Sequence, residues 1–405
     1  MNIRALGAQG DGISEANGET IYIPFTLPGE TVTADVSNGR GQLLSVDAAS
    51  PDRAPARCPH YRVCGGCNLQ HLAETPYLAF KRDLVVSALA SRGLSTDVDP
   101  TISVSPKTRR RATLAAAHTP AGFAFGFHGR RTHQIVAISD CAVLTPGLMR
   151  ALPAIEQLSR MATPPRGKLA ITATETPAGI DIAFVGAGKW FSADDRLRLV
   201  QAATETRLIR ISIDGEVVLE REKPALKAGS AFLVPPPGGF LQATSPSETA
   251  MVQLVGEAVD GARKIVDLFA GSGTFTLPLA QTANLHAIES DAAALAALAQ
   301  AARSTQSLRA VTTDRRDLFR QPLTVDELNR FDGAVMDPPR SGAEAQARNL
   351  AASKVRRLAM VSCNAASFAR DMSLLVQGGW RIDRVSPVDQ FLWSSHIEIV
   401  AALSR

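Results

Sequence analysis

The sequence lacks any long hydrophobic run, and it has few cysteines. No stretch of its 405 residues approaches the roughly 20 apolar residues that span a bilayer, so we expect no membrane-spanning helix. The first residues, MNIRALGAQGDGISEANG, are acidic and rich in glycine, which is typical of neither a secretory signal nor a transit peptide. We therefore expect a cytoplasmic protein, whose thiols stay reduced and available for metals or catalysis. No obligate protein partner is evident.

A strong charge imbalance is also lacking, because the net charge is only +4. The distribution is uneven, however. Residues 1–50 carry two basic and six acidic residues, whereas residues 51–140 carry twelve basic and six acidic ones. The basic excess includes the runs Lys107–Arg111 and Arg130–His133. Such a patch can neutralise RNA phosphates, although a solvated surface without a partner is an equally good interpretation of a charge run alone.

Four segments are distinguished along the chain. The first contains short β-branched runs between Gly and Pro turns, which predict a small antiparallel β-barrel. Next come a group of cysteines and a helix-like stretch. The third segment alternates strand-like runs with helices, which predicts an α+β domain, and a PPPGG turn ends it. The expected domains are 1–50 (β-barrel), 51–90 (cysteine segment), 91–235 (central α+β domain, including Cys141) and 236–405 (a further α/β domain).

The last segment alternates continuous apolar runs with alanine-rich helical stretches. Its apolar runs are KIVDLFAG, LHAIES, FDGAVMD, LAMVSC and HIEIVAAL. This alternation predicts a parallel, doubly wound sheet that binds ligands at the carboxyl ends of its strands. The expected fold class is therefore α/β, with a Rossmann-like domain that follows a β-barrel and an α+β domain.

The run Val266–Thr276 places an acid at a strand end, then a Gly-Ser-Gly turn, then an apolar helix. It lacks the third glycine of a dinucleotide-binding fingerprint and the Gly-Lys-Ser/Thr of a phosphate loop. Glu289 ends the next strand, where an acid can accept both ribose hydroxyls, and Asp317 follows a third strand, in a position to contact an adenine amino group. The pattern D-L-F-x-G-x-G-x-F resembles the S-adenosylmethionine loop of class I methyltransferases; an ordinary strand–turn–helix is the alternative.

Two further strand ends, and the terminal strand, contain residues that could take part in a reaction. Asp337-Pro-Pro-Arg-Ser-Gly342 follows one strand, and its prolines fix the backbone beside the expected methyl donor. Cys363 ends the next apolar run, where a thiol can serve as a nucleophile or simply be buried. Glu398 lies in the apolar terminal strand, where burial would raise the pKa of its carboxyl and suit proton transfer, unless the strand is an exposed edge.

These groups fit one reaction, the methylation of carbon 5 of a uracil. That carbon is a poor nucleophile until a thiolate adds at carbon 6 and turns the ring into an enolate. The enolate attacks the sulfonium methyl, and a base then removes the carbon 5 proton so that the thiolate can leave. Cys363, Glu398 and S-adenosylmethionine would supply the thiolate, the base and the methyl group. Because the thiolate adds above the ring face, the base must leave its stack.

Taken together, the motifs resemble the RNA uridine-5 methyltransferase family, and the likeness runs through almost the whole chain. The N-terminal LGAQGDGISEANGETIYIPFTLPGE is similar to the small β-barrel (TRAM) domain of many members. FLQAT looks like the segment whose Gln contacts the methyl donor, and VDLFAGSGTF, DPPRSG, VSCN and HIE follow in family order. The chain departs from the family at Thr244, where members often have Asn, and at Ala365, where they often have Pro.

The resemblance implies roles for individual residues. Cys363 is the expected nucleophile and Glu398 the expected general base. The resemblance and the donor loop together give the expected donor-binding residues, which are Gln242, Asp267, Phe269, Gly271, Gly273, Glu289, Asp317 and Asp337. The last domain is then a class I methyltransferase domain, and the central domain an RNA-binding one.

The resemblance also implies a 4Fe–4S cluster held by Cys58, Cys64, Cys67 and Cys141. Four thiolates can hold zinc as well as iron–sulfur. Structural zinc sites more often use two Cys-x2-Cys pairs, whereas this chain has one pair and two single cysteines. The Cys-x3-Cys-x2-Cys triad of radical enzymes is absent. We expect a structural role, in which the cluster ties distant segments together, and redox sensing stays open.

The leading hypothesis is a 5-methyluridine methyltransferase that acts on RNA. Resemblance to members with both cluster and barrel favours 23S ribosomal RNA, and the T-loop of tRNA is the alternative target. The second hypothesis is a non-catalytic RNA-binding or redox-sensing protein with the same fold, but such a protein would have no need of Cys363 and Glu398. A small-molecule methyltransferase is a third, against which the basic segment and the barrel both argue.

Overall fold

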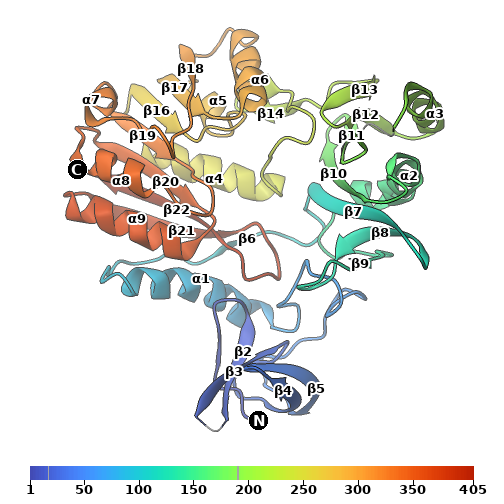
Figure 1. The fold of residues 1–405 in the computed structure, drawn as a ribbon. Helices are drawn as coiled ribbons and strands as arrows, with labels where there is room; N and C mark the ends of the chain where they lie inside the picture. The colour runs from blue at the N-terminus through green and yellow to red at the C-terminus, as the bar shows by residue number, and fades with distance from the viewer. Residues whose placement is uncertain (17, 189–190) are drawn as a thin grey trace.

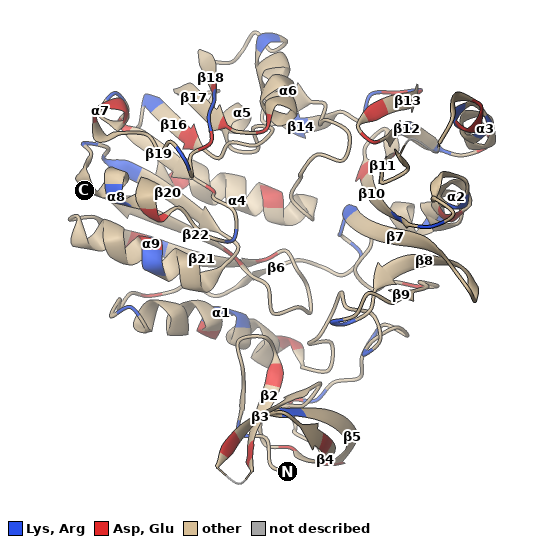
Figure 2. Ribbon diagram, in the orientation of Figure 1, with Lys and Arg blue, Asp and Glu red and all other residues tan. Residues whose placement is uncertain are grey.

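The computed structural model describes residues 1–16, 18–188 and 191–405. Figure 1 shows a small N-terminal sheet at one end, a larger and mostly antiparallel sheet on one flank, and a sheet covered by helices that forms the largest part. Among the described residues, no helix is both long enough and apolar enough to cross a membrane. Acidic and basic residues are spread over all three parts rather than gathered on one (Figure 2).

The N-terminal sheet has the strand order β1-β2-β3-β5-β4. Its strands are β1 Ala5–Leu6, β2 Asp11–Ala16, β3 Glu19–Pro24, β4 Thr31–Ser37 and β5 Arg40–Ala48. The expected antiparallel barrel is corrected in one respect, because strands β3 and β5 pair in parallel, at Tyr22 and Arg40. The two sheet edges approach each other through the bridge between Asn2 and Thr31 and through main-chain hydrogen bonds from Val32 to Met1 and from Ile3 to Glu30.

The central sheet has the order β13-β12-β11-β10-β7-β8-β9. Its strands are β7 Arg111–Thr119, β8 Gly122–His128, β9 Ile135–Val136, β10 Lys168–Thr176, β11 Gly179–Val185, β12 Leu208–Ile213 and β13 Glu216–Glu220. Helices α2 (Pro146–Ala162) and α3 (Ala193–Ala203) contribute apolar residues to its core. Thr145 caps α2 by accepting a hydrogen bond from the main-chain N–H of Leu148. This is the α+β unit expected from the alternating pattern.

The large sheet has the order β18-β17-β16-β19-β20-β22-β21-β6, and its neighbours from β18 to β20 pair in parallel. Its strands are β6 Ile102–Ser103, β16 Lys264–Leu268, β17 Asn284–Glu289, β18 Val311–Arg315, β19 Gly333–Met336, β20 Arg357–Ser362, β21 Arg381–Asp389 and β22 Glu398–Ser404. The accompanying helices are α4 Ser245–Ala258, α5 Thr276–Leu279, α6 Ala292–Arg303, α7 Val325–Leu328, α8 Glu344–Ala352 and α9 Ala365–Gln377. A hairpin of β14 (Leu226–Ala228) and β15 (Ala231–Leu233) stands apart.

Alternate residues of these strands face opposite layers. In β16, Val266 and Leu268 pack in the core with α8 and α9, whereas Ile265 packs in the core with α4 and α5. Both faces of the sheet are therefore covered, which explains why the strands read as continuous apolar runs. The doubly wound sheet predicted from the sequence is confirmed, with antiparallel additions at one edge.

Two early segments complete this sheet and its core. Helix α1 (Glu74–Ala90) buries Val85 and Leu89 in the same core as α8 and α9, and strand β6 pairs with β21 in parallel. The domain boundaries expected from sequence, at residues 90 and 235, do not separate these packing units. A central segment thus supplies the edge strand of the C-terminal sheet.

Candidate active site and cysteine cavity

A cavity of about 610 Å³ lies at the carboxyl ends of β16, β17, β19 and β20. It occurs where ligands bind to doubly wound sheets. Most of the site residues predicted from sequence line it, namely Gln242, Phe269, Gly271, Glu289, Asp317, Asp337, Cys363 and Glu398. We call it the donor cavity.

The turn after β16 forms one side of the donor cavity. Gly271 has φ +55°, and a Cβ there would meet nothing within 4 Å, so the backbone lies open to a ligand. Its main-chain N–H donates to Glu289 Oε2 at 3.0 Å, which joins the two strand ends. Phe269 also has a positive φ, 64°, which is costly for a residue with a side chain, and its ring lies 5.4 Å from that of Phe319.

Two predicted donor-binding residues lie outside the cavity lining. Asp267 is fully buried, and its Oδ2 accepts a hydrogen bond from the Thr276 hydroxyl at 2.5 Å. Its Oδ1 has no partner among the described residues, and burial raises the pKa of its carboxyl to about 7. At Gly273, a Cβ would lie 2.9 Å from Leu298, so glycine is needed there for packing against α6. Both residues support the turn from beneath.

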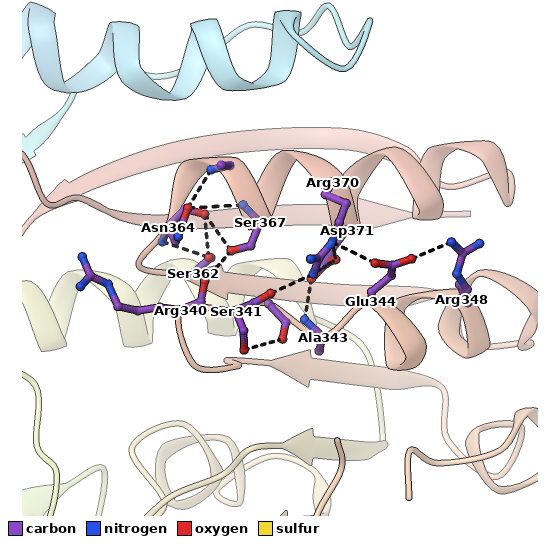
Figure 3. A network of polar contacts seen from close by, with 12 residues as sticks. Arg340, Ser341, Ala343, Glu344, Arg348, Ser362, Asn364, Ser367, Arg370 and Asp371 are labelled. Carbon is purple, nitrogen blue, oxygen red and sulfur yellow. Dashed lines mark hydrogen bonds and ion pairs between the residues drawn. The ribbon is translucent and has the colours of Figure 1, made fainter. Parts of the chain in front are cut away.

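Cys363 occupies the bend between β20 and α9. Its neighbours Ser362 and Asn364 are labelled in Figure 3. On the α9 side of the bend, the Ser367 hydroxyl donates to the Arg340 carbonyl at 3.0 Å and ties α9 to the turn after β19. Farther along that turn, the Ala343 N–H donates to Asp371 Oδ2 at 2.7 Å. These contacts hold the Asp-Pro-Pro-Arg turn against the helix that follows the cysteine.

Glu398 begins β22 and is only 5 % exposed, so it is not on an open edge. Gln390 Nε2 donates to Glu398 Oε1 at 2.9 Å and to Gln242 Oε1 at 2.8 Å. The position of Gln390 is fixed in turn, because its Oε1 accepts from the main-chain N–H of Ala243 at 2.9 Å. One amide thus joins the predicted base to the predicted donor-contacting glutamine. Sequence reasoning missed Gln390, which lies in no recognisable motif.

Three groups of the donor cavity, Glu398, Asp337 and Cys363, have raised pKa values. Burial raises the pKa of Glu398 to about 7. Burial, together with the neighbouring Glu398 and Asp267, raises the pKa of Asp337 well above its usual value. Burial, with Glu398 and Asp337, raises the pKa of the Cys363 thiol to about 11, against a lowering by Arg340. A cation bound among these groups would favour their charged forms.

A buried ion pair supports the loop between β21 and β22. Lys81 on α1 is 0 % exposed, and its Nζ donates to Asp389 Oδ1 at 2.8 Å and to the carbonyl of His396. The Tyr77 hydroxyl donates to Asp389 Oδ2 at 2.6 Å and accepts from the Trp393 N–H at 2.7 Å. Helix α1 therefore fixes the loop that precedes Glu398. No local sequence pattern indicates this pair, whose members lie 308 positions apart.

The four cysteines predicted as metal ligands line a separate cavity of about 180 Å³, the cysteine cavity. No group of three or more His, Cys, Asp or Glu side chains in the described ranges could hold a single metal ion. All four cysteines line this cavity together with the half-buried Arg109 and Arg111, and Arg111 Nε has no partner among the described residues.

The basic runs are partly engaged inside the protein. Arg130 and Arg131 both pair with Asp11, which is 2 % exposed. Arg110 pairs with Glu248 at 2.6 Å, and the half-buried Arg109 and Arg111 line the cysteine cavity. Part of the basic patch expected from charge counting is therefore engaged inside the protein, whereas Lys107 and Arg131 stay exposed.

Comparison with known proteins bears on this arrangement. A family model described as tRNA (Uracil-5-)-methyltransferase matches residues 200–405. An uncharacterized RNA methyltransferase of Agrobacterium fabrum is 44 % identical over 416 residues, which cover 100 % of this chain and 99 % of that protein. The 23S rRNA (uracil(1939)-C(5))-methyltransferase RlmD of Chromohalobacter salexigens is 32 % identical, over 100 % of this chain and 89 % of the relative.

A solved structure has the same fold. The tRNA (uracil-54, C5)-methyltransferase of Pyrococcus abyssi, in complex with S-adenosyl-L-homocysteine, superposes with a TM-score of 0.77 at 23 % identity, over 99 % of this chain and 98 % of that one. With a matching family model and relatives that align from end to end, the chain belongs to the tRNA (uracil-5-)-methyltransferase family and is an S-adenosylmethionine-dependent RNA (uracil-5-)-methyltransferase.

Proposed function

We propose that this enzyme methylates carbon 5 of a specific uridine in 23S ribosomal RNA through a covalent bond between Cys363 and carbon 6 of the base. The observation that carries the mechanism is that Cys363 and Glu398 line the same cavity as the Gly271 turn and Glu289. A nucleophile, a carboxylate and the donor loop thus face one space.

The steps follow from the chemistry of uracil. The Cys363 thiolate adds to carbon 6, and the ring electrons move to form an enolate. Carbon 5 attacks the methyl group of the sulfonium, the carbon–sulfur bond of the donor breaks, and S-adenosylhomocysteine is the product. Glu398 then takes the proton from carbon 5, the ring double bond re-forms and the thiolate leaves. The Gln390 amide holds the Glu398 carboxylate in place for that last step.

The raised pKa values fit a site that is activated by its substrates. Without a ligand, burial raises the pKa of the Cys363 thiol to about 11 and raises the pKa of Asp337 well above its usual value. A sulfonium cation in the donor cavity lowers the pKa of each group, because it stabilises thiolate and carboxylate alike. S-adenosylmethionine should therefore bind first, and Cys363 should attack the RNA base only afterwards.

The choice of ribosomal RNA is supported by the RlmD relative, which aligns with all of this chain. The tRNA T-loop is the second candidate, because the structure with the same fold is that of a tRNA (uracil-54, C5)-methyltransferase. Mass mapping of 5-methyluridine in ribosomal and transfer RNA from a deletion strain distinguishes the two. Loss of the modification from tRNA alone would contradict the 23S assignment.

We also propose that Cys58, Cys64, Cys67 and Cys141 hold a 4Fe–4S cluster with a structural role. The cavity that the four cysteines share and the half-buried Arg109 and Arg111 that also line it support this proposal. When bound, the cluster would cross-link the segment before α1 to the segment before α2. It takes no part in the methyl transfer proposed above.

Cys363→Ala tests the covalent mechanism. Methylation should fall to background, whereas the affinity for S-adenosylmethionine should stay within about twofold, because the donor turn is unchanged. Isothermal titration measures the affinity, and tritium transfer to RNA measures turnover. Methylation at the normal rate would remove the covalent step. Loss of both donor binding and turnover would instead indicate a folding defect, for which Cys363→Ser is the control.

A further inference from the structure

A second cavity, of about 760 Å³, opens on the other side of Cys363. It lies between the N-terminal sheet, helix α1 and the bend that carries the cysteine. Arg340, Cys363 and His396 line both this cavity and the donor cavity. We call it the flanking cavity. The nucleophile therefore stands between two spaces, only one of which the methyl-transfer steps use.

The flanking cavity has apolar walls and an acidic character. Its apolar lining includes Leu6, Pro28, Leu72, Pro76, Phe80 and Leu84. Asp52 and Asp83 are exposed, and neither side chain has a hydrogen bond or ion pair among the described residues. The one arginine of the lining, Arg340, donates to His396 Nδ1 at 2.7 Å. Two free carboxylates repel phosphate, so the cavity is unsuited to the RNA backbone.

A nucleobase suits these walls. An aromatic side chain such as Phe80 offers a stacking surface to any unstacked base. A carboxylate accepts a hydrogen bond from an exocyclic amino group, as acidic residues do from cytosine. The target uracil must reach Cys363 from the donor cavity, because the methyl group is there. An RNA strand held at that point has its neighbouring nucleotides at the mouth of the flanking cavity.

We propose that the flanking cavity binds a base adjacent to the target uridine, one that carries an exocyclic amino group (adenine, guanine or cytosine). This inference rests on the proposed RNA methylation. It adds a second extruded base, which is read by Phe80 through stacking and by Asp52 or Asp83 through the amine. The site then selects sequence beside the uridine and not only the uridine itself.

The test uses RNA fragments that span the uridine methylated by the wild-type enzyme. In a set of fragments, each neighbouring nucleotide is made abasic in turn, and kcat/KM is measured. Phe80→Ala should lower kcat/KM about tenfold on the intact RNA, in line with the loss of one stacked base. On the one fragment that lacks the bound base, wild type and variant should be equally slow, since the two changes remove the same contact.

Controls separate this result from damage to the fold. Phe80→Leu keeps the apolar volume and removes the stacking surface, so it should behave like Phe80→Ala in kcat/KM while keeping the wild-type melting temperature. Phe232→Ala, on the exposed face of β15 and outside both cavities, should match wild type. A loss that is identical on every abasic fragment, or no loss on intact RNA, would overturn the proposal.

A second arm tests the amino group. The identified neighbour is replaced by its analogue without the exocyclic amine, which should slow the wild type severalfold but not the double variant Asp52→Ala/Asp83→Ala, which has lost both acceptors. Equal wild-type rates on both RNAs would overturn the amine assignment. If the wild type methylates no uridine in any RNA, the proposed function fails first and this inference falls with it; normal wild-type activity with an unaffected Phe80→Ala removes the inference alone.

Discussion

The donor cavity and the cysteine cavity are built in different ways. The donor cavity lies at the ends of neighbouring parallel strands, and its residues follow those strands by one to a few positions. The cysteine cavity lies among turns, and its four cysteines lie outside the named strands and helices. Isolated bridges hold this region, for example between Cys64 and Gly129. One cavity is supported by a sheet, whereas the other depends on contacts between distant loops.

This difference leads to an expectation about stability. A cavity at the end of a covered sheet keeps its shape without a ligand, because its backbone hydrogen bonds and core are complete. A cavity among loops has few such contacts and gains order from whatever binds it. Damage to the cysteine cavity should therefore leave donor binding intact. Damage to groups between the two regions should affect both.

Glu398→Gln should give the largest effect, confined to the donor cavity. We expect turnover to fall by about 10³-fold or more, because the base that resolves the adduct is lost. The glutamine oxygen can still accept from Gln390, so the fold should persist. A protein–RNA adduct that survives a denaturing gel should accumulate. Glu257→Gln, an exposed acid on α4, is the matched control. An unchanged rate without adduct would show that Glu398 is not the base.

Lys81→Met should come next and should affect both regions. Removing the lysine leaves Asp389 buried without its partner, and such a loss costs about 4 kcal/mol of unfolding free energy. Denaturant titration measures it. Lys81→Met/Asp389→Asn should recover part of the loss, because no charge then stays unpaired. Weaker donor binding and weaker cysteine-region order in the single variant would agree with a shared support; a loss below 1 kcal/mol would contradict it.

Cys67→Ser should act on the cysteine cavity alone. Wild-type protein purified without oxygen should be brown and hold about four irons per chain. The variant should lose this colour and about 3 kcal/mol of stability, similar to the loss of a cross-link that closes a long loop. Its affinity for S-adenosylmethionine should match that of wild type. Iron analysis and titration calorimetry provide the two readouts, with Cys363→Ala as the thiol control. A colourless zinc protein would overturn the cluster assignment.

The pH dependence should show the smallest effect. Burial raises the pKa of Glu398 from its usual value of 4.5 to about 7, so below that pH the group is mostly protonated and inactive as a base. We expect kcat, measured with both substrates saturating, to rise about tenfold per unit as the pH increases toward 7 and then to level off, because Glu398 acts after the methyl transfer. A pH–rate profile from 5 to 9 measures this limb. A flat profile across pH 6–8 would mean that Glu398 is ionised throughout.

Local patterns were enough to predict much of the fold and the donor cavity. The parallel strands appear as apolar runs because both faces are covered, and their carboxyl ends mark the cavity. Strand β21 was missed because its sequence, RIDRVSPVD, begins with charged residues and contains Pro387, which argues against a strand. Strand β2 was missed because Asp11 is a buried acid that pairs with Arg130 and Arg131.

Features formed by distant segments could not be predicted. Lys81 looks like an exposed helix residue, and only its contact with Asp389 shows that it is buried. The basic runs look like a phosphate-binding patch until their acidic partners are placed beside them. The flanking cavity brings together residues from the beginning, the helix α1 segment and the end of the chain. No local sequence pattern predicts that these distant segments lie together.

The early position of α1 and β6 has a consequence for biosynthesis. Strand β6 pairs with β21, which begins at Arg381, so its partner leaves the ribosome roughly 280 residues later. At typical translation speeds of about 5–20 residues per second, this is a wait of roughly 15 to 60 s. During that time, Val85 and Leu89 of α1 lack the C-terminal residues that they pack against, which makes this part of the helix a target for chaperones. Nascent-chain folding should therefore finish only when the last strands emerge.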